Sequence, residues 1–163
     1  MKKIIIILFL IFIFLQFFQI DKTNSPVNKG MDFLTIKNTP ENLATQIKNS
    51  CYDCHSDETK YPWYSYIQPL GWFLKNHIEE GRKELNFSTF ATYEPKRQAH
   101  KLDEAAEMVE HNEMPLESYL LIHGEAKLTD AQKVEFTNYF RKVEEDIRVA
   151  NNLAPEPAKP EKK

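Results

Sequence analysis

The pattern of apolar and polar positions divides the chain into an N-terminal apolar segment and a longer region of amphipathic helices. Residues 4–18 are apolar except for Gln16, and Lys2 and Lys3 precede them. A basic start followed by an apolar stretch of this kind is typical of a secretory targeting segment. We therefore assign residues 1–20 to a signal anchor or a signal peptide.

Cleavage of this segment would decide how the rest of the chain is held. At about 1.5 Å per residue, a helix of this length would span roughly 25 Å, near the lower limit for a membrane helix. No cleavage signal of small residues follows, because residues 19–22 read QIDK. The sequence favours an uncleaved anchor, with a cleaved signal peptide as the alternative. Both place the rest of the chain outside the cytoplasm, since Lys2 and Lys3 hold the N-terminus inside.

Four later segments show the spacing of amphipathic helices, and proline opens the first three of them. Thr39 is the expected N-cap of the first, with Pro40 at its first position, while Pro69 and Pro95 open the next two. The apolar positions at helical spacing are Leu43, Ile47 and Cys51 in the first, Leu70, Phe73, Leu74, His77 and Ile78 in the second, and Leu102, Ala105, Met108 and Val109 in the third.

The last predicted helix begins at a capping box formed by Thr129 and Gln132. Its apolar stripe is Val134, Phe136, Tyr139, Phe140, Val143 and Ile147. No segment shows the sustained alternation of a strand, so we expect an all-α domain. We assign residues 21–38 to a polar tether, 39–150 to the helical domain and 151–163, rich in proline and charge, to a disordered tail.

The formal net charge of the whole chain is −3, which gives no reason to expect binding to nucleic acid. Aromatic residues make up 12% of the chain. Because each aromatic side chain buries a large area, so small a domain can still form a compact core or the wall of a flat ligand.

The sequence Cys51-Tyr52-Asp53-Cys54-His55 carries the most specific chemistry in the chain. Two thiols at this spacing can meet the two vinyl groups of haem, and the imidazole that follows can reach the iron. A zinc site would need more ligands than two cysteines supply. A structural disulfide or a dithiol redox pair would account for the cysteines but not for His55. We therefore predict one covalently attached haem c, with His55 as an iron ligand.

The second iron ligand is less clearly marked. Met114 is the leading candidate, because Pro115 stops a helix there and favours an extended residue before it. A thioether on such a loop can face a haem, and it would raise the reduction potential. His77 is the main alternative, although a core histidine bonded to a backbone carbonyl is the simpler reading of that position. The remaining candidates are Met31, Met108, which we expect in the core, and His100, His111 and His123.

With these residues in place, the chain resembles class I cytochrome c, in which a short helix leads into C-x-x-C-H and a methionine follows on a later loop. More narrowly, residues 40–145 resemble a bacterial haem-binding domain family found widely in Bacteroidetes. The resemblance rests on the stretch CYDCHSDETKYPWYSYIQPLGWFLKNHIEEGRKELNFS and on EMP with LIHGEAKLT. It implies a small helical domain around one haem. The aromatic residue Trp72 is a candidate for the wall of that haem, with packing between helices as the alternative.

The resemblance implies haem binding but no particular reaction, and the function that we expect is one-electron transfer by the single haem rather than catalysis. The expected partners are exported or membrane redox proteins and the cytochrome maturation machinery, with the N-terminal segment in the membrane. The expected location is the periplasmic side of the inner membrane, or the soluble periplasm after cleavage. The rival functions are a haem-based sensor of small ligands, a peroxidase-like haem protein and a thiol-disulfide protein.

Overall fold

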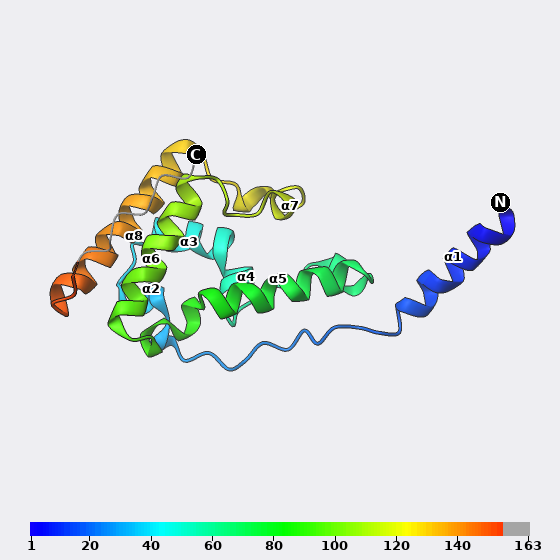
Figure 1. Cartoon of the computed structure of the whole chain (residues 1–163), viewed down its shortest axis with the longest axis horizontal. Coiled ribbons are helices and arrows are strands. Elements are labelled where there is room, and N and C mark those ends of the chain that lie inside the picture. Colours follow the sequence, from blue (N-terminus) through cyan, green and yellow to red (C-terminus); the bar gives the residue numbers. More distant parts are fainter. Residues whose placement is uncertain (155–163) are drawn as a thin grey trace.

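The computed structural model describes residues 1–154, and its frame is a pair of long helices packed along each other. Helix α6 (Pro95–Glu110) and helix α8 (Asp130–Ala150) lie side by side (Figure 1). Their facing residues are buried and recur at helical spacing: Ala99, Leu102, Ala106 and Val109 in α6, and Phe136, Phe140, Val143 and Ile147 in α8. The predicted capping box of Thr129 and Gln132 is confirmed.

The cysteine motif lies on a series of short helical turns. Helix α3 (Glu41–Ile47) continues into a π-helical turn, Lys48–Tyr52, and then into α4 (Asp53–His55). Helix α3 starts one residue later than predicted, because Pro40 is its N-cap. The other short elements are Lys29–Met31, α2 (Phe33–Ile36), Trp63–Tyr66, Phe87–Thr92, α7 (Glu117–Leu120) and Gly124–Ala126.

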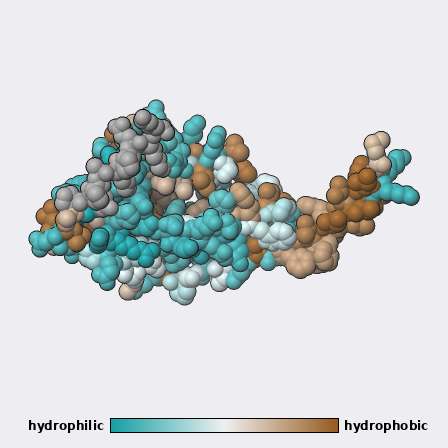
Figure 2. Space-filling view, in the orientation of Figure 1, coloured by the Kyte–Doolittle hydropathy of each residue, from teal (hydrophilic) through white to brown (hydrophobic). Residues whose placement is uncertain are grey.

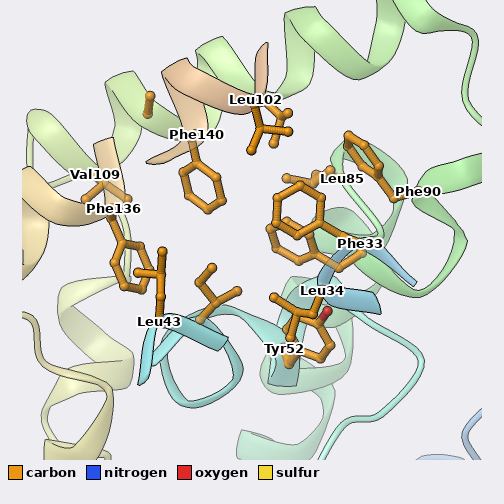
Figure 3. Packing of buried hydrophobic residues seen from close by; sticks show 14 of the residues in the cluster. Phe33, Leu34, Leu43, Tyr52, Leu85, Phe90, Leu102, Val109, Phe136 and Phe140 are labelled. Carbon is orange, nitrogen blue, oxygen red and sulfur yellow. The ribbon is translucent and has the colours of Figure 1, made fainter. Parts of the chain in front are cut away.

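The buried centre of the domain includes a residue from the segment that we assigned to a tether. Phe33 has no exposed surface, and its ring centroid lies 5.3 Å from that of Phe87 and 5.0 Å from that of Phe90 (Figure 3). Asp32 caps α2 by accepting a hydrogen bond from the backbone of Leu34. The polar tether expected over residues 21–38 is therefore part of the folded domain from Asp32 onward.

Helix α5 (Leu70–Glu84) extends from the domain like an arm, and α1 (Lys2–Leu15) lies beyond its far end (Figure 1). The segment that follows α1 runs back along α5 toward the domain (Figure 1). Arg82 holds it there by donating hydrogen bonds to Asn24 Oδ1 and to the Ser56 carbonyl, and by lying 3.7 Å from a carboxylate oxygen of Asp57. Within residues 1–154, no helix is both long and apolar enough to cross a membrane.

The all-α expectation is confirmed, since residues 1–154 form helices and turns without a strand. Leu70, at the start of α5, is 49% exposed, and two further apolar positions expected inside are more than half exposed: Phe73 (57%) and Val134 (60%). The side chains of Phe73 and Val134 point away from the buried stripe, because successive side chains on a helix are rotated by about 100° around its axis. Of the predicted tail, residues 155–163 lie outside the described part of the chain.

Truncating Phe33 to alanine tests whether its segment belongs to the core. Phe33→Ala should lower the free energy of unfolding by about 3–5 kcal/mol, because it removes a fully buried ring from an aromatic cluster. Denaturant unfolding followed by circular dichroism measures the change. The matched control is Met31→Ala, which alters a side chain that is 40% exposed and should cost no more than about 0.5 kcal/mol. Equal effects of the two changes would contradict the assignment.

Candidate functional site

A cavity of about 470 Å³ opens between α4, α5, α6 and the loop that follows α6. Cys51, Cys54 and His55 all line it. They meet there because positions four apart on a helix share a face and positions three apart lie close to it. The π-helical turn at Lys48–Tyr52 followed by the α-helical turn at Asp53–His55 supplies this spacing.

The ring of His55 is held in one orientation by the backbone of the segment that follows α5. Its Nδ1 lies 3.0 Å from the carbonyl oxygen of Leu85. A carbonyl can only accept, so Nδ1 carries the proton and Nε2 keeps its lone pair. Burial lowers the pKa of His55, against the opposing effect of the Leu85 and Gly81 backbone. The imidazole is therefore neutral near pH 7, which is the form that binds a metal.

The two thiols are free and are not arranged as a reactive redox pair. Burial raises the pKa of Cys51 to about 12, and the charge of Cys54 adds to this effect. Burial and then the Asp53 carboxylate raise the pKa of Cys54 to about 11. Dithiol oxidoreductases lower a thiol pKa instead, so this environment disfavours a thiol-disulfide role.

Helix α5 approaches the motif at a glycine. A Cβ atom on Gly81 would lie 2.7 Å from the carbonyl oxygen of Cys54, closer than real contacts allow. Only glycine therefore lets the two backbones pack at this distance. The same face of α5 carries His77, Glu80 and Glu84 into the cavity lining.

Three of the candidate second ligands, Met114, Met108 and His77, line the same cavity. Helix α6 ends at Glu110, and Asn112 takes a left-handed conformation with φ of 59°. The chain then turns back so that the backbone N–H of Met114 donates to the carbonyl of Met108. The expectation that Met108 belongs to the core is wrong, because its side chain is 37% exposed and borders the cavity.

His77 behaves partly as expected, since its Nδ1 lies 2.9 Å from the carbonyl of Phe73. This contact leaves Nε2 with a lone pair, so His77 keeps its place as the alternative ligand. The structure does not bring Met31, His100, His111 or His123 to the cavity lining.

Trp72 does not line the cavity either, so its assignment to the wall of the haem is corrected. Trp72 and Gly81 are nine residues apart on α5, about two and a half turns, and therefore face opposite sides of the helix. The indole Nε1 of Trp72 donates to the carbonyl of Phe18 instead, over 2.9 Å.

Sequence reasoning missed three residues near the motif. Tyr52 is buried, stacks on Phe87 and donates a hydrogen bond to Asp32. Asp53 lines the cavity and accepts a hydrogen bond of 2.7 Å from the hydroxyl of Tyr119. Both lie in the spacer of the motif, and nothing in the local pattern identifies their partners, which are distant in sequence.

Lys101 is the third missed residue, and among residues 1–154 it is the one Lys or Arg that lines the cavity. It donates hydrogen bonds to Glu84 and Glu104, over 2.9 and 2.7 Å. Burial lowers its pKa, but these hydrogen bonds and charges raise it on balance. The cavity thus has a fixed positive charge among carboxylates.

The site fits the expected haem in size and chemistry. Its volume is in the usual range of about 300–1,000 Å³ for pockets that enclose a small molecule. Leu85, Phe87, Val109 and Phe140 supply apolar walls, and Lys101 supplies a cation for carboxylates. The two thiols and an oriented, neutral imidazole complete a set of donors suited to a covalently held haem.

A methyl group added at Gly81 tests the close approach of α5 to the motif. Gly81→Ala should lower the free energy of unfolding by about 1–3 kcal/mol and reduce the amount of haem retained, because the new Cβ would displace α5 from Cys54. Denaturant unfolding and haem absorbance measure the two effects. Gly124→Ala is the control, since a Cβ there meets nothing within 4 Å. A Gly81→Ala protein as stable as this control would contradict the packing.

Comparison with known proteins agrees with this site. A family model described as a haem-binding domain matches residues 10–142, a range that includes the cysteine motif, α5, α6 and Met114. The chain matches no curated protein and no solved structure. Since the match covers most of the chain, the protein belongs to the haem-binding domain family.

Proposed function

We propose that this protein is a monohaem c-type cytochrome that transfers single electrons outside the cytoplasm. Membership of the family establishes haem binding. The observation that carries the finer proposal is the arrangement of Cys51, Cys54 and His55 around one cavity, with the His55 ring already oriented by the Leu85 carbonyl. When bound, the haem supplies an iron that accepts or releases one electron.

The roles of the residues follow from their positions. Cys51 and Cys54 hold the haem through thioether bonds, and His55 ligates the iron through Nε2. Met114 is the proposed ligand on the other side, on a loop whose backbone is held by the Met108 carbonyl. His55 and Met114 would together hold the iron, which would exchange one electron without a change of protein ligands.

The remaining cavity residues support this function. Phe87 and Phe140 are almost fully buried and exclude water from the floor of the site. Lys101, which already donates hydrogen bonds to Glu84 and Glu104, is the cation of the cavity lining that could also bind a haem carboxylate. A fixed environment of this kind suits an electron carrier, because little has to move when the iron changes its charge.

The proposed location is the periplasmic side of the inner membrane, with α1 as the anchor. The support is the apolar run at residues 4–18 behind Lys2 and Lys3. Soluble periplasmic protein after cleavage is the alternative. The proposed partners are exported or membrane redox proteins, and the cytochrome maturation machinery attaches the haem.

Visible absorption spectra of the full chain, produced together with a cytochrome maturation system, test the proposal. We expect sharp bands in the reduced protein, a weak iron–thioether band in the oxidised protein, and haem that stays attached after denaturation. Haem that is lost on denaturation would overturn covalent attachment. Rapid binding of carbon monoxide by the reduced protein would favour a sensor instead, and peroxide turnover well above that of free haem would favour a peroxidase.

Substitution of the two cavity methionines tests the second ligand. Met114→Ala should abolish the iron–thioether band and lower the reduction potential, because a thioether ligand stabilises the reduced iron. Met108→Ala is the matched control, since Met108 lines the same cavity and should leave both properties unchanged. Loss of the band in the control alone would reassign the ligand to Met108. If both proteins show the spectrum of two histidine ligands, His77 would be the ligand.

A further inference from the structure

Beyond the N-terminal apolar segment, one long stretch of this strongly charged chain also has no charged residue. Residues 61–74, YPWYSYIQPLGWFL, contain no Asp, Glu, Lys, Arg or His, although 28% of the chain is charged. Lys60 and Lys75 flank the stretch on its two sides. Both tryptophans of the chain, Trp63 and Trp72, lie within it. None of its residues lines the haem cavity, so the proposed electron transfer does not account for it.

Five of the large side chains of this stretch are exposed. We call them the aromatic shoulder, which consists of Trp63, Tyr66, Leu70, Trp72 and Phe73, with exposed fractions of 66, 58, 49, 38 and 57%. Exposed apolar side chains in such a group usually mark an interaction surface. The shoulder lies where Trp63–Tyr66 leads into α5, at the end of the arm that is remote from the α6–α8 pair (Figure 1).

The apolar N-terminal segment is attached to this same place by specific hydrogen bonds. The side-chain amide of Gln16 donates to the carbonyl of Gln68 and accepts from its backbone N–H, over 3.0 and 2.9 Å. Gln19 donates to the carbonyl of Tyr66, and Trp72 donates to the carbonyl of Phe18. The two amides that interrupt the apolar run therefore join it to the shoulder.

These contacts make the shoulder continuous with α1. From Ile4 to Phe14 the residues of α1 are exposed and apolar, and they form a hydrophobic projection from the end of the molecule (Figure 2). The reciprocal pair between Gln16 and Gln68 restrains both the position and the direction of the projection. An apolar environment that surrounds α1 would therefore also contact the aromatic shoulder.

We propose that the aromatic shoulder lies in the headgroup region of the lipid bilayer that receives α1, so that the haem domain rests on the membrane in one fixed orientation. Tryptophan and tyrosine favour this boundary, because their rings are apolar and their N–H and O–H groups remain near water. Lys60 and Lys75 flank the uncharged stretch, and Lys22 lies 4.1 Å from the centre of the Tyr66 ring. Such cations suit anionic headgroups.

The consequence for the haem site is a fixed height above the bilayer. Helix α5 carries Phe73 in the shoulder and His77 to Glu84 along the cavity. At about 1.5 Å per residue, the cavity residues of α5 lie roughly 6 to 16 Å along the helix from Phe73. The site is thus held close to the membrane surface. This inference rests on the membrane location in the proposed function, and not on the identity of the iron ligands.

Oxidative footprinting of the full, haem-containing chain in lipid nanodiscs with one copy per disc tests this contact. The discs contain phosphatidylcholine and phosphatidylglycerol, and mass spectrometry measures the reaction of hydroxyl radicals with each side chain. We expect Trp63 and Phe73 to react several-fold less than their exposed fractions imply. Met31 and Val149, which are 40 and 69% exposed and lie elsewhere, serve as references and should react as their exposure implies.

Each outcome of this experiment decides something different. Full reaction of Trp63 and Phe73 in discs that retain the protein would overturn the proposal. Protection that appears only in discs with two copies would overturn it in favour of contact between copies. A protein that does not stay with the discs would refute the membrane location itself, while its haem spectrum would still test the proposed electron transfer.

A pair of charge substitutions tests the fixed orientation. Trp63→Glu combined with Phe73→Glu should change the linear dichroism of the haem band in oriented bilayers, because the charged shoulder would leave the headgroup region and the domain, together with the attached α1, would take a different tilt. The control is Val134→Glu combined with Val149→Glu, which charges two exposed positions of α8 and should leave the dichroism intact. Circular dichroism verifies that both variants keep their helices. Unchanged dichroism in the shoulder variant would overturn the proposal.

Discussion

Helix α5 approaches the cysteine motif so closely at Gly81 that a single methyl group there would meet the carbonyl of Cys54. The cavity depends on this contact. It sets the distance between α4 and α5, and it brings His77, Glu80 and Glu84 to the side of the thiols. It also places the residue after α5, Leu85, where its carbonyl orients the His55 ring. One backbone approach thus determines both the shape of the site and the orientation of the His55 imidazole.

The same helix links the site to the N-terminal segment. At its cavity end, Arg82 binds the returning chain through Asn24 and the motif through the Ser56 carbonyl. At its other end, Trp72 and the backbone of Gln68 bind the segment that contains α1. Because α5 is held at both ends, it fixes the orientation of the haem site relative to α1. Any restraint on the orientation of α1 therefore also restrains the haem site.

The chemistry of the cavity distinguishes a cysteine pair that attaches haem from a cysteine pair that acts as a redox dithiol. A redox dithiol needs an accessible thiol with a lowered pKa, whereas burial raises the pKa of both Cys51 and Cys54 here. The imidazole of His55 is neutral and has one nitrogen occupied. These conditions agree with the proposed function, in which the thiols would react once, during haem attachment, and the imidazole would then bind the iron.

The sequence by itself determined the local features: the all-α class, the capping box of Thr129 and Gln132, and the grouping of Cys51, Cys54 and His55. These follow from helical periodicity and from contacts within one or two turns, which act before any tertiary packing. Only the tertiary structure decided that Phe33 is in the core, that Met108 borders the cavity and that Trp72 faces away from it. The sequence pattern shows that a helix has an apolar face but not which element covers it. That choice depends on contacts between residues far apart in the chain, such as Gly81 with Cys54 and Gln16 with Gln68.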